Sequence, residues 1–184
     1  MFIISNFSRD FYIFLRRAAV PNSCRQFYNN KGGVGKTTLA ANVGYNLSTM
    51  GYRVLLVDCD PQGNLSSFFC RYDLTKKGLM QALGGQPRCI YRTAYRGLDI
   101  LPGNIYSEAL TPQPQTMATL LQGYAAHYDY CILDCAPAFS RLTESAVQAS
   151  DQVIIPIKLD NFSIEGIDTT TVSYTHLRAH ETEL

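Results

Sequence analysis

The chain alternates between short apolar runs and longer segments in which apolar residues recur with helical spacing. The runs at 54–57 and 130–133 are continuously apolar or aromatic, which is typical of strands covered on both faces of a sheet. Leu39, Val43 and Leu47 recur every fourth residue and predict a helix that Gly51 can end. Further strands are predicted at 98–101 and 153–157, and further helices at 75–83, 117–124 and 142–149. This alternation predicts an α/β fold with a parallel sheet flanked by helices.

Length and composition narrow the class of protein. The 184 residues predict one domain, and a hydrophobic content of 46% is enough for a globular core. The net charge of +1 argues neither for nor against a nucleic-acid partner. Six cysteines without a C-x-x-C pair favour free thiols in a reducing cytosol. No apolar run approaches the ~18 residues of a membrane span, so the sequence predicts a cytoplasmic protein without one.

The segment 31–38, KGGVGKTT, has the composition of a phosphate-binding loop. Three glycines in four positions let the backbone approach an anion, and the following helix N-terminus adds free N–H groups. Lys36 would meet the β- and γ-phosphates of ATP, and the Thr37 hydroxyl would hold Mg²⁺. A glycine-rich turn that carries lysines by chance is the alternative, and eight consecutive matching positions disfavour it. The predicted nucleotide-binding residues are Lys31, Gly32, Gly33, Val34, Gly35, Lys36, Thr37 and Thr38.

Two positions depart from the general phosphate-loop pattern. Asn30 stands where that pattern has glycine, and Lys31 adds an early lysine. With these two residues the loop resembles the deviant Walker A loop of the ParA/MinD family of ATPases. The resemblance implies that Lys31 reaches the phosphates of the partner subunit in an ATP-dependent homodimer. The approach to the loop is unusual, because Arg25 and Gln26 are costly in a central strand. Either that strand is short or the sequence upstream of Phe27 is not the native start.

Three aspartates follow predicted strands, at the edge of the sheet where ligands of α/β proteins gather. Asp58 and Asp60 follow 54–57, and Asp134 follows 130–133. Taken singly, each could be a turn residue or a helix cap. The segment 58–64, DCDPQGN, resembles switch I of the ParA branch, and 134–137, DCAP, resembles the Walker B and switch II segment. The resemblance implies that Asp60 orients the attacking water and that Asp58, Asp134 and Thr37 serve the Mg²⁺ site. Lys36 and Lys31 would balance the charge that develops during phosphoryl transfer.

The resemblance covers 29–167 and implies a P-loop NTPase-like fold with ATP and Mg²⁺ as ligands. D-P-Q-G-N favours the partition branch over the cell-division and nitrogenase-reductase branches. It implies an ATP hydrolase that acts as a dimer switch in DNA segregation, with non-specific DNA and a ParB-like protein as partners. Two alternatives stay open. The chain could be a non-catalytic fragment that retains only the phosphate loop, or a MinD-like ATPase that positions cell division.

Both ends of the chain differ from the family pattern. Residues 1–26 form an N-terminal extension of uncertain role, whose Phe7, Phe11 and Phe14 have the spacing of an amphipathic membrane anchor. Residues 27–171 are predicted to be an incomplete ATPase domain, with its C-terminal part missing. In 172–184, His176 and His180 could contribute to a metal site or lie in a solvated tail. The segment also resembles the translation of a transposase-type sequencing adaptor, which predicts a non-native tail and a gene that continues past residue 171.

Overall fold

The computed structural model describes residues 2–3, 11–12, 14–15, 23–29, 32–70, 76–103, 105–109 and 111–158. Asn30, Lys31 and everything predicted for 159–184 lie outside these residues. The sequence hypotheses about the C-terminal tail and its histidines therefore stay predictions.

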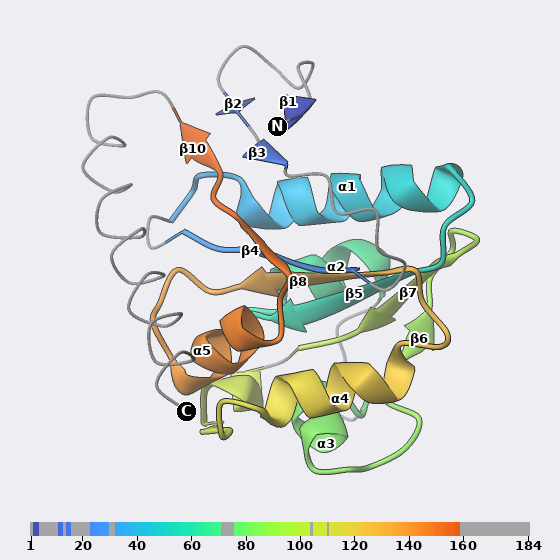
Figure 1. The fold of residues 1–184 in the computed structure, drawn as a ribbon. Helices are drawn as coiled ribbons and strands as arrows, with labels where there is room; N and C mark the ends of the chain where they lie inside the picture. The colour runs from blue at the N-terminus through green and yellow to red at the C-terminus, as the bar shows by residue number, and fades with distance from the viewer. Residues whose placement is uncertain are drawn as a thin grey trace.

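Six strands form one sheet in the order β6-β7-β5-β8-β4-β9 (Figure 1). All neighbouring strands run parallel except β6, which pairs antiparallel with β7. The strands are β4 Ser23–Phe27, β5 Val54–Cys59, β6 Tyr91–Arg92, β7 Leu98–Leu101, β8 Tyr130–Cys135 and β9 Gln152–Ile154. The predicted α/β fold with a mostly parallel sheet is confirmed.

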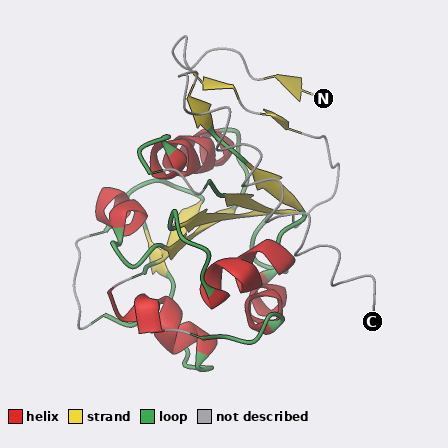
Figure 2. Cartoon of the chain, turned by 90° about the vertical axis from the view of Figure 1, so that its left-hand side faces the viewer, coloured by secondary structure: helices red, strands yellow, loops and turns green. Residues whose placement is uncertain are grey.

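Helices cover both faces of this sheet, so the protein has three layers (Figures 1 and 2). Alternate residues of β5 divide between two hydrophobic clusters, as the two-residue period of a strand requires. Leu56 packs with residues of α1 and α2, and Leu55 packs with residues of α3, α4 and α5. The helices are α1 Lys36–Thr49, α2 Asn64–Phe69, α3 Leu79–Leu83, α4 Thr116–Tyr124 and α5 Arg141–Gln148, with a 3₁₀ turn η1 at Ile105–Ala109.

Strand β4 carries the polar residues that made its prediction difficult. It nevertheless lies between β8 and β9, and Gln26 and Phe27 are fully buried. The Gln26 amide donates to Cys135 Sγ at 3.1 Å, and the Arg25 guanidinium lies 5.0 Å from the ring centroid of Tyr130. These two contacts compensate part of the cost of placing polar side chains in a parallel sheet.

The predicted strand at 153–157 was wrong in its extent. β9 ends at Ile154, and Ile157–Lys158 form a separate strand, β10, which pairs antiparallel with β2 at Phe11–Tyr12. The interruption includes Pro156, which has no N–H to donate to a strand ladder. The backbone oxygen of Pro156 accepts a hydrogen bond from the Asn29 side chain at 2.8 Å.

Other elements differ from the sequence expectation as well. The helix predicted at 75–83 is shorter in the structure, where α3 spans only Leu79–Leu83. Gly78 is its N-cap, and the Gly78 amide donates to the Gln81 side chain at 2.9 Å. Helix α2, strand β6 and η1 were not predicted. Phe11 and Phe14 lie in short strands, β2 and β3 (Phe14–Leu15), rather than in an amphipathic helix; β3 pairs with β1 (Phe2–Ile3).

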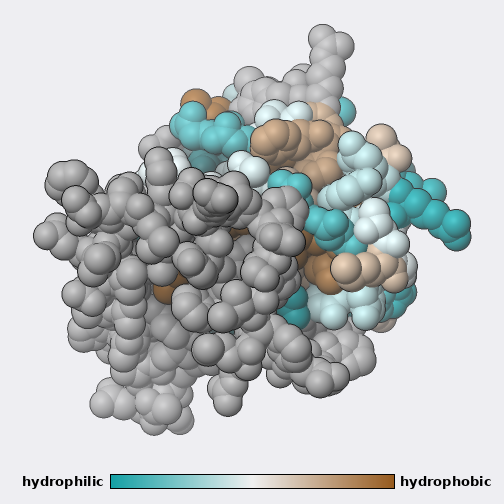
Figure 3. Space-filling view, turned by 90° about the horizontal axis from the view of Figure 1, so that it is seen from above, coloured by the Kyte–Doolittle hydropathy of each residue, from teal (hydrophilic) through white to brown (hydrophobic). Residues whose placement is uncertain are grey.

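Among the described residues, every helix is too short or too polar to cross a bilayer. Figure 3, which views the molecule from above, shows hydrophilic and hydrophobic residues interspersed over the described part of that face.

Candidate active site

The phosphate loop connects the carboxyl end of β4 to the N-terminus of α1. Gly33 and Gly35 have φ angles of 72° and 84°, which side chains disfavour, and Gly35 is the N-cap of α1. No side chain caps this helix and no acidic residue lies in its first turn. A Cβ atom at Gly32 or Gly33 would meet no atom of the described residues within 4 Å. The loop therefore presents open space next to a helix terminus with partial positive charge, which fits a phosphate group.

Lys36 is the first residue of α1 and is buried. Its Nζ donates to the backbone oxygen of Asn29 at 3.1 Å, so the side chain folds back over the loop. Burial lowers the pKa of Lys36, while the negative charges of Asp134 and Asp60 raise it. The ammonium group thus lies near Asp60, which follows β5, and near Asp134, at the end of β8. A phosphate would supply a stronger counter-charge at the same place.

Asp58 is fully buried at the end of β5 and both of its oxygens are hydrogen-bonded. Oδ2 accepts from the amide and the hydroxyl of Ser66 at 2.8 and 2.6 Å, and Oδ1 accepts from the Asp60 amide at 3.1 Å. The Ser66 hydroxyl also accepts from the Gly103 amide at 3.1 Å. Burial raises the pKa of Asp58 to about 6, although the bonds from Ser66 and Asp60 oppose the rise. Asp58 therefore holds three segments together at this edge of the sheet.

Asp60 lies two residues further, in the turn that leads to α2. Its Oδ1 accepts from the Gln62 amide at 2.9 Å, and its backbone oxygen accepts from the Gly63 amide at 2.9 Å. The residue is 8% exposed. These bonds fix the orientation of the Asp60 carboxylate and leave capacity for a further donor, such as a water molecule.

Asp134 is the residue whose environment is most unusual. It is fully buried at the end of β8, and neither carboxylate oxygen has a hydrogen-bond partner of ordinary geometry among the described residues. Burial raises its pKa to about 7, and nearby Asp58 and Asp60 add to the rise. The Thr37 hydroxyl and Lys36 lie close enough to lower the same pKa in part.

Mg²⁺ fits this arrangement of Asp134 and Thr37. Within the described ranges, no group of three or more His, Cys, Asp or Glu side chains could hold a metal ion. Mg²⁺ at nucleotide sites needs fewer protein ligands than that, because phosphate oxygens and waters complete its octahedron. An unpartnered buried carboxylate beside a threonine hydroxyl and an anion cradle satisfies this requirement.

The structure brings most of the predicted site residues to one edge of the sheet. Residues 32–38 come after β4, Asp58 lies near the end of β5, Asp60 follows that strand, and Asp134 lies near the end of β8. Lys31 lies outside the described residues. Sequence reasoning missed Ser66, Asn29 and Gly103. Ser66 follows the D-P-Q-G-N segment closely, but only the unpredicted helix α2 turns it toward Asp58.

Comparisons with known proteins agree with this geometry. Residues 24–183 match the sequence pattern of a family described as an AAA domain. The sporulation initiation inhibitor protein Soj of Bacillus subtilis is 35% identical in an alignment over 160 residues, and the match covers 76% of this chain and 59% of Soj. The chain belongs to the ParA/MinD family of P-loop ATPases. The chromosome partitioning protein ParA of Caulobacter vibrioides is 34% identical over 152 residues, covering 76% of this chain and 57% of that ParA.

Solved structures confirm the predicted ParA/MinD fold. Cobyrinic acid a,c-diamide synthase of Mycobacterium smegmatis, with bound ADP and magnesium, superposes with a TM-score of 0.80 at 27% identity, over 86% of this chain and 69% of the synthase. A plasmid partition protein of Borrelia burgdorferi superposes with a TM-score of 0.75 at 24% identity, over 85% of this chain and 74% of that protein. Because the fold occurs in a synthase and in a partition protein, the fold alone does not separate these functions.

The ParA/MinD chain spans between 51% and 59% of the length of the curated relatives it matches. The residues that match the family, 24–183, include the loop and the three aspartates. The activity and partners of the whole relatives are therefore matters for proposal.

Proposed function

We propose that this chain binds Mg²⁺-ATP at the carboxyl edge of its sheet and forms the nucleotide-binding part of a partition-type ATPase. The observation that carries the proposal is the buried carboxylate of Asp134, which lacks a hydrogen-bond partner among the described residues and lies near Thr37, in the first turn of a helix whose N-terminus has no side-chain cap. A cation is the simplest partner for such a carboxylate, and a phosphate is the simplest partner for such a helix end. ATP with Mg²⁺ satisfies both at once.

The loop residues bind and neutralise the phosphates. The amides of 32–38 would bind a phosphate of the nucleotide, and Lys36, which now donates to the Asn29 carbonyl, would supply positive charge to the phosphate oxygens. Lys31 adds a second positive charge from the partner subunit, as in the family that the loop resembles. Asp134 and Thr37 hold Mg²⁺, which when bound offsets charge on the transferred phosphoryl group.

The two residues of switch I have different roles. Asp60 orients a water molecule for attack on the γ-phosphate, because its carboxylate is held in place and retains acceptor capacity. Asp58 positions Asp60 through the bond to its amide and supports the metal site without direct contact, since both its oxygens already accept hydrogen bonds. Phosphoryl transfer to water needs this positioning more than covalent catalysis.

The biological role proposed is DNA segregation in the cytoplasm. ATP would close a homodimer, the dimer would bind DNA non-specifically, and a ParB-like partner would trigger hydrolysis and release. The names of the relatives in Bacillus and Caulobacter and the D-P-Q-G-N segment support this branch of the family.

Replacement of Lys36 by alanine tests the nucleotide site directly. We expect Lys36→Ala to weaken binding of a fluorescent ATP analogue at least about 100-fold, because the charge-assisted contacts of the ammonium are lost. Lys77→Ala is the matched control, since Lys77 is an exposed lysine in the segment that precedes α3. Undiminished affinity in Lys36→Ala would refute the site. Tight binding by the unmodified chain without phosphate release would support the alternative of a non-catalytic fragment.

A further inference from the structure

A second hollow surface lies at the amino ends of the strands, at the end of the sheet opposite the proposed ATP site. Arg53, Gly97 and Asp129 immediately precede β5, β7 and β8, so they lie at the amino ends of these strands. Asp58 and Asp134 lie at the carboxyl ends of β5 and β8. Six-residue strands rise by about 3.3 Å per residue, which separates the two edges by roughly 20 Å. The proposed ATP site therefore does not use this surface.

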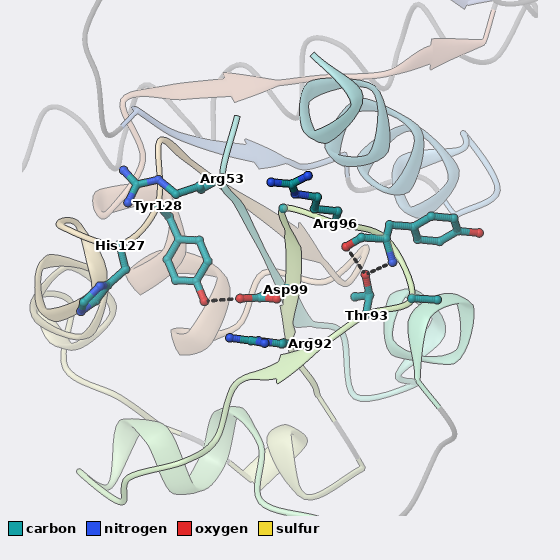
Figure 4. Close-up of a pocket in the computed structure, with 10 residues that line it drawn as sticks. Arg53, Arg92, Thr93, Arg96, Asp99, His127 and Tyr128 are labelled. Carbon is teal, nitrogen blue, oxygen red and sulfur yellow. Dashed lines mark hydrogen bonds between the residues drawn. The ribbon is translucent and has the colours of Figure 1, made fainter. Parts of the chain in front are cut away.

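One half of the surface is a basic pocket with a volume of 610 Å³ (Figure 4). Arg53, Arg92, Arg96 and His127 line it, and we call these four residues the basic lobe. No described residue hydrogen-bonds or ion-pairs with the guanidinium of Arg92 or Arg96, and both residues are exposed. Two unpaired guanidinium groups that border one hollow form an anion-binding surface.

The acidic groups near the basic lobe already have partners. Asp99, which also lines the pocket, accepts from the Tyr128 hydroxyl at 2.9 Å. Arg53 forms a salt bridge with Asp129 at 2.9 Å, which fixes the guanidinium at the rim. Asp99 lies opposite Arg92 in the pairing of β6 with β7, but neither Asp99 nor Asp129 forms a hydrogen bond or ion pair with the guanidinium of Arg92 or Arg96.

The other half is a neighbouring pocket of 670 Å³ rich in tyrosine. Tyr45, Tyr52 and Tyr95 line it and are 40–46% exposed, and we call these three residues the tyrosine lobe. Tyr45 and Tyr95 pack edge to face with ring centroids 5.0 Å apart, so their positions are fixed. Both pockets are lined by Arg53, Tyr95 and Arg96, which makes the two lobes parts of one groove.

We propose that this groove binds an extended acidic peptide segment of a partner protein. Carboxylates of the peptide would meet Arg92 and Arg96, and a large apolar side chain would pack in the tyrosine lobe. Arginine and tyrosine are the residue types enriched where a few side chains supply most of the binding energy of an interface. The rigid tyrosine pair lowers the entropic cost of forming such a contact.

A peptide fits the groove better than a nucleic-acid strand does. Asp99 lies among the cationic side chains of the pocket, where a continuous phosphodiester backbone would pass it with one negative charge per nucleotide. A peptide can place a neutral residue at that point. The edge-to-face packing of Tyr45 with Tyr95 also covers a ring face that a stacked base would need.

The test measures peptide binding to the full chain by fluorescence anisotropy. The probe is a short fluorescein-labelled peptide in which Asp alternates with Leu and Phe, and the comparison peptide has Asn in place of Asp. We expect saturable binding that weakens with added salt and is lost with the Asn peptide. Arg96→Glu should weaken binding at least about tenfold, since it replaces a charge-assisted contact by repulsion.

Two variants and one ligand serve as controls. Lys77→Glu changes the net charge by the same amount at a residue outside the groove and should leave the affinity within about twofold. Arg92→Glu repeats the test at a second exposed position, and far-UV circular dichroism verifies that each variant is folded. The proposal would be overturned if Arg96→Glu bound the acidic peptide as tightly as the parent chain does. It would also be overturned if the parent chain bound the acidic peptide and the Asn peptide equally well. Tighter binding of oligothymidylate than of the acidic peptide would overturn it in favour of nucleic acid. Arg96→Glu should bind ATP as the parent chain does. A loss of peptide binding in this variant can therefore be distinguished from a defect of the nucleotide site.

Discussion

Asp134 and Asp58 look alike in the sequence, since each follows an apolar run directly, yet their environments in the structure differ. Both oxygens of Asp58 accept hydrogen bonds from Ser66 and Asp60, whereas those of Asp134 accept none of ordinary geometry from the described residues. Removing a carboxylate from water without such bonds penalises its ionised form. The difference depends on Ser66, which the unpredicted helix α2 delivers, so sequence alone could not reveal it.

The elevated pKa of Asp134 predicts how stability depends on pH in the absence of nucleotide. The folded-state pKa of about 7 lies above that of an unfolded aspartate, so the folded chain binds the extra proton. This contribution is complete below the unfolded pKa of about 4 and is lost as the pH rises through 7. From pH 5 to 8 it should lower the free energy of unfolding by about 1–3 kcal/mol.

Asp134→Asn removes the titrating group and tests this reasoning. Urea unfolding at pH 5, 6, 7 and 8 should show a flatter pH dependence for the variant than for the parent chain. Because Asp58 raises the pKa of Asp134, the difference between the two curves reports Asp134 together with its coupling to Asp58. Parallel curves would mean that Asp134 is ionised throughout this range.

At the scale of elements, the end of β7 is packed tightly against the end of β5. A Cβ atom at Gly103 would lie 2.5 Å from the backbone oxygen of Asp58, and the Gly103 amide donates to Ser66. Glycine is thus required by a close approach of two backbone segments. The sequence shows a glycine after Pro102, as many turns do, and gives no sign of this approach.

Substitution of Gly103 should therefore be costly. Gly103→Ala is expected to lower the free energy of unfolding by about 1–3 kcal/mol, because backbone rather than a flexible side chain must move. Gly123→Ala is the matched control, since Gly123 is exposed in α4 and a Cβ there meets nothing within 4 Å. The control should raise stability by about 0.5–1 kcal/mol through helix propensity. The urea unfolding midpoints of both variants are compared with that of the parent chain. Equal changes in midpoint for Gly103→Ala and Gly123→Ala would contradict the packing argument.

Strand β4 shows at the same scale why elements with polar residues escape prediction. Tyr130 and Cys135 contact Arg25 and Gln26 and satisfy part of their polar groups, but they lie more than a hundred residues further along the chain. Strands β5 and β8 were predicted from apolar runs, because burial on both faces of the sheet gives a strand a nearly continuous apolar composition.

At the scale of the whole molecule, the sheet separates two surfaces of different character. The alternation of strands and helices predicted the parallel sheet, and the rule that ligands gather at carboxyl ends predicted which residues meet there. The strand order and the antiparallel edge strand β6 were not predictable, because they depend on contacts between distant segments. The basic lobe was missed for the same reason: Arg53 and Arg96 are far apart in sequence and meet only through the pairing of β5 with β7.

The proposed dimer switch is a property of the whole molecule and predicts opposite effects for two residues of the nucleotide site. Lys31→Ala should reduce ATP-dependent association, because Lys31 is expected to contact the partner's phosphates. Asp60→Ala should leave ATP binding intact and prolong the associated state, because the attacking water is no longer oriented. Light scattering with Mg²⁺-ATP, alongside phosphate release, measures both effects, and Lys77→Ala provides a lysine variant outside the site. Parental hydrolysis by Asp60→Ala would refute its assignment, and unaltered association of Lys31→Ala would refute the cross-dimer contact while leaving the phosphate loop in place.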